Sequence, residues 1–233
     1  MSGKLYGVGV GPGDPELLTL KALRLIKENQ AIAVPGNDIY TSVAYKIVKG
    51  AYEELDKKTL FPVAMPMTKD PAVLQANHEK AADDVEKYLK EGQNVVFLTL
   101  GDPTVYSTYL YVHKRILKRG YEAEIVSGIT SFCAVAARLN MGLVEMAEPL
   151  HVIPATYKAQ EMDQILELPG TKVLMKTGKK MQQVRESILN SGQDAVMIEN
   201  CGMEDEKIYR SAEEIPESFG YYSLIIVKEN QQK

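Results

Sequence analysis

The sequence predicts an α/β protein with a mostly parallel N-terminal sheet and a mixed C-terminal sheet. Three observations carry this prediction. Short apolar runs alternate with longer amphipathic stretches from Leu5 to Asn140, which is typical of βαβ units around a parallel sheet. Glycine-rich segments join several of these runs to the stretch that follows. No helix of normal length separates the last two apolar runs, which favours mixed pairing in the second sheet.

The spacing of apolar residues, and the residues that end each helix, define the expected elements up to residue 140. Leu17, Leu18, Ala22, Leu25 and Ile26 recur at helical spacing, and Gly92 ends a long amphipathic stretch. The strongest strand signal is the apolar run before Gly101. Strands are expected at 5–10, 31–34, 58–63, 94–100 and 122–126, and helices at 15–27, 42–49, 71–91, 104–118 and 129–140.

A break in this pattern predicts a domain boundary. The segment 145–149 is short, rich in acidic residues and ends in proline, so we expect an N-terminal αβα domain over 1–146 and a C-terminal αβα domain over 147–233. Expected strands of the second part are 150–154, 171–175, 195–199, 207–210 and 222–227, with helices at 160–166 and 180–189.

Composition excludes several classes of function. The 233 residues carry a formal net charge of -4 and no long basic block, which disfavours nucleic acid as the main partner. Cys133 and Cys201 match no zinc spacing, and three scattered histidines favour neither a metal site nor a nucleophile triad, so no protein-bound metal is expected. Neither a secretory signal nor a membrane span is recognisable, so a cytoplasmic location is expected.

The first glycine-rich segment is GVGVGPGDP, residues 7–15. Asp14 and Pro15 suit the start of a helix, but they leave the glycines unexplained. Surplus glycines indicate backbone that closely approaches either packed chain or a ligand, and both remain open. Pro12 and Asp14 interrupt the dinucleotide fingerprint, and an acidic cap opposes a phosphate at this position.

Two further segments follow strands that should end at the same sheet edge. Gly101-Asp102-Pro103 comes directly after the most apolar strand, and Asp102 either caps a helix or binds a cationic or hydroxyl group there. Thr130 and Ser131 lie in the segment 127–132 between the next strand and helix. Their hydroxyls either cap that helix or face the same edge as Asp102.

Three motifs in this order carry a resemblance to a known family. GVGVGPGDPELLTLKA (7–22), GDPTVYSTYLYV (101–112) and VSGITSFCAVAARL (126–139) resemble the tetrapyrrole methylases. That family implies an S-adenosylmethionine-dependent methyltransferase with two αβα domains and an active-site cleft between them. Tyr106-Ser107-Thr108 resembles the enzymes that methylate C20 of precorrin-2 or cobalt-factor II in cobalamin biosynthesis, while the glycine-rich continuation of uroporphyrinogen methylases is absent.

The resemblance also implies roles for individual residues and an assembly. A homodimer is implied, and Lys176 or Tyr106 is a candidate for removing the meso proton after methyl transfer. The residues implied for the cofactor are Leu100, Gly101, Asp102, Val105, Tyr106, Thr130, Ser131, Thr177 and Cys201, and those for the tetrapyrrole are Gly9, Gly11, Pro12, Gly13 and Asp14. Because the tetrapyrrole carries carboxylates, Arg138 and Lys176 are candidates for binding them.

Alternative functions stay open at this point. They are methylation of another ring carbon or of uroporphyrinogen III, methylation of RNA or protein by the same fold, and a binding module without activity. A dinucleotide-dependent oxidoreductase is disfavoured by the interrupted fingerprint. The sequence does not distinguish a metal-free from a cobalt-containing substrate.

Overall fold

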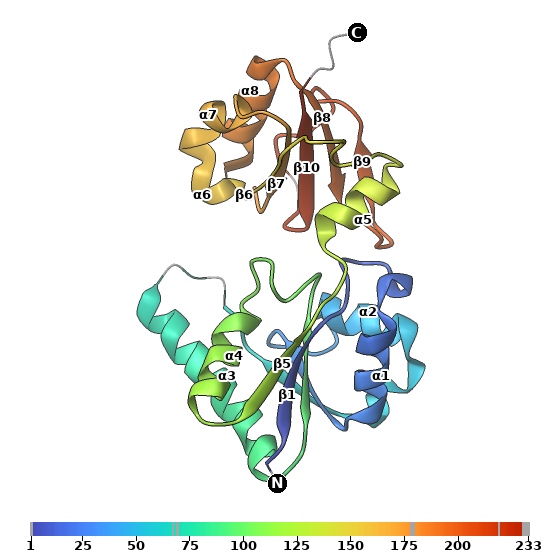
Figure 1. The fold of residues 1–233 in the computed structure, drawn as a ribbon, viewed down its shortest axis with the longest axis vertical. Coiled ribbons are helices and arrows are strands. Elements are labelled where there is room, and N and C mark those ends of the chain that lie inside the picture. Colours follow the sequence, from blue (N-terminus) through green and yellow to red (C-terminus); the bar gives the residue numbers. More distant parts are fainter. Residues whose placement is uncertain (1, 67, 69, 178–179, 219, 230–233) are drawn as a thin grey trace. The chain divides into compact units, whose positions relative to one another are not determined.

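The computed structural model describes residues 2–66, 68, 70–177, 180–218 and 220–229. The chain divides into two compact units, Met1–Thr130 and Ser131–Lys233 (Figure 1). Each unit contains its own sheet and its own hydrophobic core. Among the described residues, none of the helices has the length and apolar character needed to cross a membrane.

The first unit is built on a parallel sheet, as expected. Its five described strands lie in the order β3-β2-β4-β1-β5, and every pair of neighbours runs parallel. The central strand β4 is buried along its whole length, as a strand covered on both faces must be. The strands are β1 (Lys4–Gly9), β2 (Ala31–Pro35), β3 (Thr59–Val63), β4 (Val95–Thr99) and β5 (Glu122–Val126).

Helices cover both faces of this sheet (Figure 1). The helices α1 (Leu20–Glu28) and α2 (Val43–Ala51) pack on one face against a core that contains Ile26 and Leu98. The helices α3 (Pro71–Lys90) and α4 (Tyr109–Lys118) pack on the other face with Phe97. Because alternate residues of β4 face opposite sides, Leu98 and Phe97 belong to different cores.

Two helices, α1 and α4, begin five residues later than the sequence predicts. Asp14 caps only a 3₁₀ turn, Pro15–Leu17, and α1 begins at Leu20 because Thr19 accepts a hydrogen bond from the Ala22 N–H. The helix expected from residue 104 begins at Tyr109, since the backbone turns into the left-handed region at Tyr106, where φ is 49°.

The second unit contains the predicted mixed sheet, with strand order β6-β7-β10-β8-β9. Only the described pair β6–β7 is parallel, and β10 runs antiparallel to both of its neighbours. Its elements are α5 (Ser131–Arg138), β6 (Leu150–Pro154), α6 (Ala155–Lys158), the 3₁₀ turn Ala159–Glu161, α7 (Met162–Leu166), β7 (Thr171–Met175), α8 (Met181–Ser191), β8 (Asp194–Glu199), β9 (Lys207–Tyr209) and β10 (Ser223–Lys228).

The division between the units falls between Thr130 and Ser131, ahead of the boundary expected after residue 146. Helix α5 accounts for the difference. Its Val135 and Ala136 are buried with Ile198 and Leu224 in a core of the second unit. The acidic segment that marked the expected boundary therefore lies within the second unit.

Tyr109 joins α4 to the sheet. Its side chain is almost fully buried, and its ring lies against the Cα of Gly7 in β1. A Cβ added to Gly7 would lie 2.0 Å from two ring atoms of Tyr109, so no other residue type fits here without displacing the ring. The Tyr109 hydroxyl lies 3.0 Å from Nδ1 of His113, one helical turn further on.

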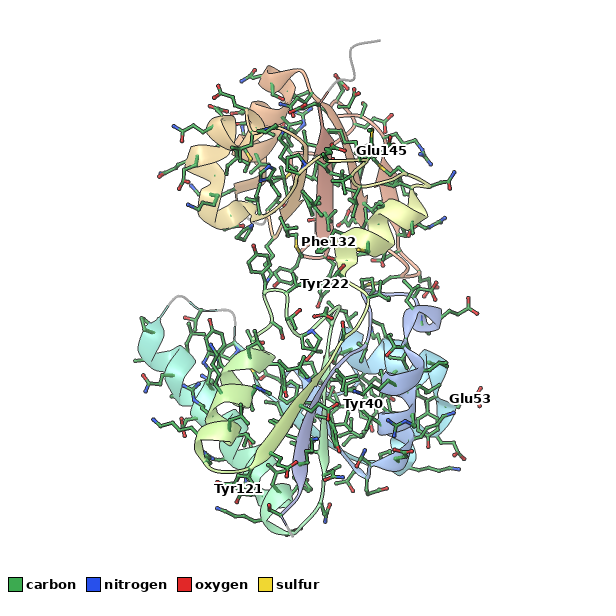
Figure 2. All side chains as sticks on the ribbon, in the orientation of Figure 1. Tyr40, Glu53, Tyr121, Phe132, Glu145 and Tyr222 are labelled. Carbon is green, nitrogen blue, oxygen red and sulfur yellow. The ribbon has the colours of Figure 1, made fainter. Side chains whose placement is uncertain are left out.

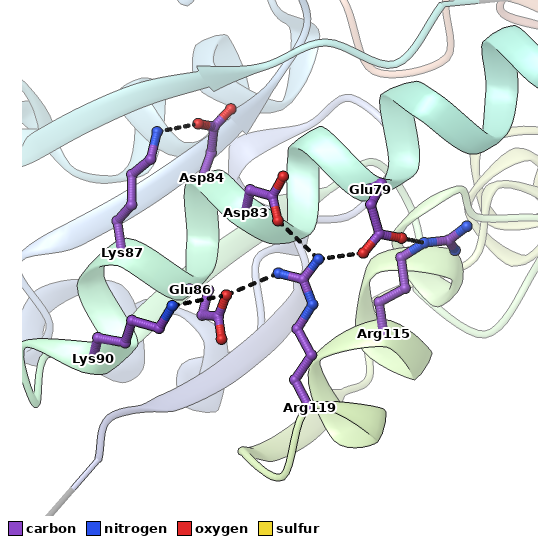
Figure 3. Close-up of polar contacts among 8 residues, drawn as sticks. All are labelled: Glu79, Asp83, Asp84, Glu86, Lys87, Lys90, Arg115 and Arg119. Carbon is purple, nitrogen blue, oxygen red and sulfur yellow. Dashed lines mark hydrogen bonds and ion pairs between the residues drawn. The ribbon is translucent and has the colours of Figure 1, made fainter.

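Ion pairs join α3 to α4 (Figure 3). Arg119, the residue directly after α4, contacts three acidic residues of α3: Glu79, Asp83 and Glu86. The Arg119 side chain is only 20% exposed, so its interactions are less screened than those of a surface pair. Lys87 and Asp84, on the same helix α3, form a more exposed pair.

We expect Gly7→Ala to destabilise the first unit by about 1–3 kcal/mol, because the new methyl group overlaps the Tyr109 ring. Denaturant unfolding of Gly7→Ala, Tyr109→Leu and the double variant measures the effect. The free energy of unfolding of the double variant should fall by less than the sum of the two single decreases, because the smaller side chain at position 109 relieves the overlap. Additive losses would contradict this packing.

Replacement of Arg119 by Met should lower the free energy of unfolding by about 1–2 kcal/mol, because three carboxylates lose their shared partner. Lys87→Met is the matched control and should leave stability unchanged, since its pair is exposed. Thermal unfolding at low and high salt makes the comparison. Equal effects of the two substitutions would show that the Arg119 network does not stabilise the helix pair.

Candidate functional site

The candidate site in the first unit lies at the carboxyl ends of β1 and β4. These strands are neighbours, but the chain leaves β1 toward β2 and leaves β4 toward β5, in opposite directions across the sheet. This is the topological switch point of an open α/β sheet, where ligands characteristically bind. The loops that follow the two strands carry both of the Gly-Asp-Pro motifs predicted from the sequence.

Three strand ends approach one another at contact distance here. The Gly11 N–H donates to the Gly101 carbonyl oxygen at 3.3 Å, and the Gly101 N–H donates to that of Gly11 at 2.8 Å. A Cβ added to Gly9 would lie 2.6 Å from both the Gly101 oxygen and the Gly128 nitrogen. At Gly9, packed chain thus accounts for the surplus glycine that the sequence left unexplained.

The Asp102 carboxylate is the most densely bonded group of this edge. Its Oδ1 accepts hydrogen bonds from the Thr104 N–H at 2.7 Å and the Thr104 hydroxyl at 2.5 Å. Its Oδ2 accepts from the Ser127 hydroxyl at 2.5 Å and the Gly128 N–H at 2.9 Å. Burial by itself raises the pKa of Asp102, but these four hydrogen bonds to the charged form lower it below its usual value.

The other predicted residues of the first unit surround this point with different exposure. Asp14 accepts a hydrogen bond from the Glu16 N–H at 2.8 Å and so caps its turn. Tyr106 is 45% exposed and has a positive φ, a strained conformation that is typical of functional loops. Gly11, Pro12 and Gly13 are buried, whereas Leu100, Val105 and Thr130 are half-buried.

The second unit places its predicted residues where β7 and β8 end. Lys176 and Asn200 follow these strands, and both adopt the left-handed conformation with φ of 54°. Burial lowers the pKa of Lys176. The Asn200 N–H donates to the Tyr222 carbonyl oxygen at 2.8 Å, which joins the end of β8 to the start of β10. Thr177 and Cys201 are the next residues along the chain.

Two buried hydroxyls at this sheet edge have no hydrogen-bond partner among the described residues. They belong to Thr177, which is 0% exposed, and to Ser223, which is 7% exposed. Leu224 of β10 pairs with Met175 of β7, so Ser223 and Thr177 both lie just beyond this pair, at the ends of adjacent strands. An unsatisfied buried hydroxyl is costly, and such groups are few in native proteins. The pair therefore fits a polar ligand.

Ser131 and Arg138 lie at the two ends of α5, separated by about 10 Å along the helix axis. The Arg138 Nε donates to Glu206 Oε1 at 2.8 Å, and Glu206 also accepts from the Gly202 N–H. Arg138 thus braces the loop after β8. Figure 2 labels Phe132 at the start of α5 and Tyr222 before β10. Within the described ranges, no cluster of His, Cys, Asp and Glu could hold a metal ion.

Sequence reasoning missed two polar residues of these edges. Ser127 lies in a recognised segment, but nothing local indicates that its hydroxyl reaches Asp102 on another strand end. Ser223 opens a strand of ordinary composition, and its lack of a partner depends on the sheet that surrounds it. The alternation of side chains along β10 is the only local signal. It predicts which face of the sheet the Ser223 side chain lies on, but not which groups surround it.

Comparisons with known proteins agree with this architecture. The model of the family Tetrapyrrole (Corrin/Porphyrin) Methylases matches residues 4–216. A probable cobalt-precorrin-2 C(20)-methyltransferase of Methanocaldococcus jannaschii is 38% identical over 231 residues, which is 97% of this chain and 96% of the relative. A precorrin-2 C(20)-methyltransferase of a Sinorhizobium species is 28% identical, over 97% of this chain and 95% of the relative.

A solved structure shares the fold. Uroporphyrin-III C-methyl transferase from Thermus thermophilus, complexed with S-adenyl homocysteine, superposes with a TM-score of 0.71. The match covers 97% of this chain and 98% of that one at 22% identity. With the family model matching most of its length, the chain belongs to the tetrapyrrole methylase family.

Proposed function

We propose that the protein transfers a methyl group from S-adenosylmethionine to C20 of precorrin-2 or of its cobalt-containing oxidised form, cobalt-factor II, in cobalamin biosynthesis. The observation that carries this proposal is the similarity, over nearly the full length, to relatives named for that reaction. Those two names differ over cobalt, so both substrate forms belong to the proposal. A homodimer, which the family resemblance implies, is proposed with it.

The chain's own groups suit S-adenosylmethionine at both sheet edges. The buried hydroxyls of Thr177 and Ser223 would bind polar atoms of the cofactor. Residues 100–102 would line its methionine part, and Val105 and Tyr106 would contact the same ligand. The further residues proposed to contact it are Thr130, Ser131 and Cys201. When bound, the cofactor supplies a sulfonium methyl group that is already activated toward attack by an electron-rich carbon.

The protein therefore needs no nucleophile of its own. Its contribution is to align the two reactants at near-attack distance and to exclude water. Rigid loops serve this purpose, and the hydrogen bonds between Gly11 and Gly101 couple the loop proposed for the tetrapyrrole to the loop proposed for the cofactor. The loop Gly9–Asp14 would contact the tetrapyrrole, with Pro12 and Gly13 among its buried residues.

Three further side chains are proposed to remove the meso proton and to bind the substrate carboxylates. Lys176 is one candidate for accepting the meso proton, because burial lowers the pKa of its amine and favours the neutral, basic form. Tyr106 is the other candidate, with its strained backbone and exposed ring. Arg138 would bind a substrate carboxylate in competition with Glu206.

The direct test incubates the purified protein with S-adenosylmethionine and either precorrin-2 or cobalt-factor II. We expect the tetrapyrrole to gain the mass of one methyl group and its absorbance spectrum to change, with one of the two forms preferred. Uroporphyrinogen III is the control substrate and should gain no methyl group. Methylation of uroporphyrinogen III alone would contradict the proposal.

Replacing Thr177 by Val should weaken the binding of S-adenosylhomocysteine by about tenfold and leave stability unchanged or higher, because its hydroxyl has no partner within the described chain. Thr171→Val, at the other end of β7, is the matched control. Its hydroxyl donates to the Leu143 carbonyl oxygen at 2.6 Å, so this variant should lose stability and keep its affinity. Calorimetry and thermal unfolding separate the two patterns. Wild-type affinity in Thr177→Val would remove this residue from the cofactor site.

A further inference from the structure

We propose that the Asp102 carboxylate has a positioning role: it acts on the cofactor by joining two loops and does not contact the cofactor itself. Its carboxylate, the Ser127 hydroxyl and the Gly128 N–H form a connection that we name the Asp102 bridge. The proposal rests on the proposed function, because the loops it joins are those assigned to the cofactor. It assigns to Ser127 a role that neither motif nor family likeness provided.

The acceptor capacity of Asp102 is the first argument. An ionised carboxylate offers about four lone-pair sites on its two oxygens. Four donors of the protein already contact them, two at each oxygen, at 2.5–2.9 Å. Asp102 as a whole residue is also only 5% exposed. A ligand N–H thus finds no unused lone pair on this carboxylate, although the backbone of the loop remains accessible to ligands.

The course of the bridge across the sheet is the second argument. Asp102 follows β4 and Ser127 follows β5, and these strands are separated by β1. The bridge therefore joins strand ends that share no ladder hydrogen bonds, and it passes the end of β1 at Gly9. A Cβ added to Gly128 would lie 2.3 Å from the Gly101 oxygen and 2.8 Å from two backbone atoms of Gly9.

The three loops consequently move as one body. The bridge couples the loops after β4 and β5, and the paired hydrogen bonds of Gly11 and Gly101 couple the loops after β1 and β4. Loosening the bridge would displace the cofactor loop and the tetrapyrrole loop together. Because the reaction depends on their alignment, both the affinity for cofactor and the turnover at saturation should fall.

Thr104 offers a matched control for Ser127. Both residues are exposed, and both donate a hydroxyl hydrogen bond of 2.5 Å to the same carboxylate. Thr104, however, lies two residues from Asp102 in the same loop, whereas Ser127 lies in another loop. Ser127→Ala removes a connection between loops, while Thr104→Ala removes one within a loop.

The expected results follow from this difference. Ser127→Ala should weaken the binding of S-adenosylhomocysteine about tenfold and lower kcat about tenfold at saturating substrates. Thr104→Ala should change each by less than about threefold, and Ser127→Thr, which keeps the hydroxyl, should restore both. Amide exchange at Gly128 should accelerate in Ser127→Ala without ligand, and more than in Thr104→Ala.

Asp102→Asn distinguishes the bridge from direct contact of the carboxylate with the sulfonium of the cofactor. A carboxylate that touches the sulfonium would favour S-adenosylmethionine over the neutral S-adenosylhomocysteine, so its loss would reduce that preference. The Asp102 bridge predicts equal losses for the two molecules. A selective loss for S-adenosylmethionine, or equal effects of Ser127→Ala and Thr104→Ala, would overturn the proposal.

The exchange measurement keeps this proposal separate from the proposed function. If the wild-type protein failed to bind S-adenosylhomocysteine, the proposed function would fail. Amide exchange at Gly128 in the unliganded protein would still report whether Ser127 holds the two loops together. Unchanged exchange in Ser127→Ala would overturn the bridge even in an active methyltransferase.

Discussion

The contact between the ends of β4, β1 and β5 is the constraint on which the first unit depends. At Gly9, Gly101 and Gly128, three segments of the backbone lie closer together than a side chain at Gly9 or Gly128 would allow. The Asp102 carboxylate then joins the two outer strand ends across the middle one. Hydrogen bonds from four donors offset the cost of burying this charge. A rigid backbone surface forms at the edge where a parallel sheet binds ligands.

The second unit also forms a sheet edge suited to a ligand, but it does so with strained backbone and buried hydroxyls. Its edge contains two residues in the left-handed conformation, Lys176 and Asn200, and two buried hydroxyls without described partners. These features are unfavourable in the folded state by themselves. The apolar cores on both faces of the mixed sheet provide the stability that retains them. Unfavourable local features gathered at one edge are typical of a surface adapted to a ligand.

Much of the site could be predicted because its parts are local. Each Gly-Asp-Pro motif follows a strand, and strands of a parallel sheet end at a common edge, so convergence of the loops follows from order alone. The helix starts were predicted less well. Thr19 competes with Asp14 as a cap, and the turn at Tyr106 delays α4 until Tyr109. The starts of both helices depend on backbone conformations that several residue types can adopt, so the residue types alone do not predict them. The early division at Thr130 depends on which core buries α5.

The sequence by itself determined the alternation of strands and helices, the parallel and mixed sheets, and the family. These properties follow from periodicity and from motifs that neighbouring residues carry. Only the tertiary structure decided what Asp102 contacts. Its partners Ser127 and Gly128 lie on another strand end, and β1 separates the two strands. Hydrogen bonds across a sheet depend on strand order and register, which no short segment contains.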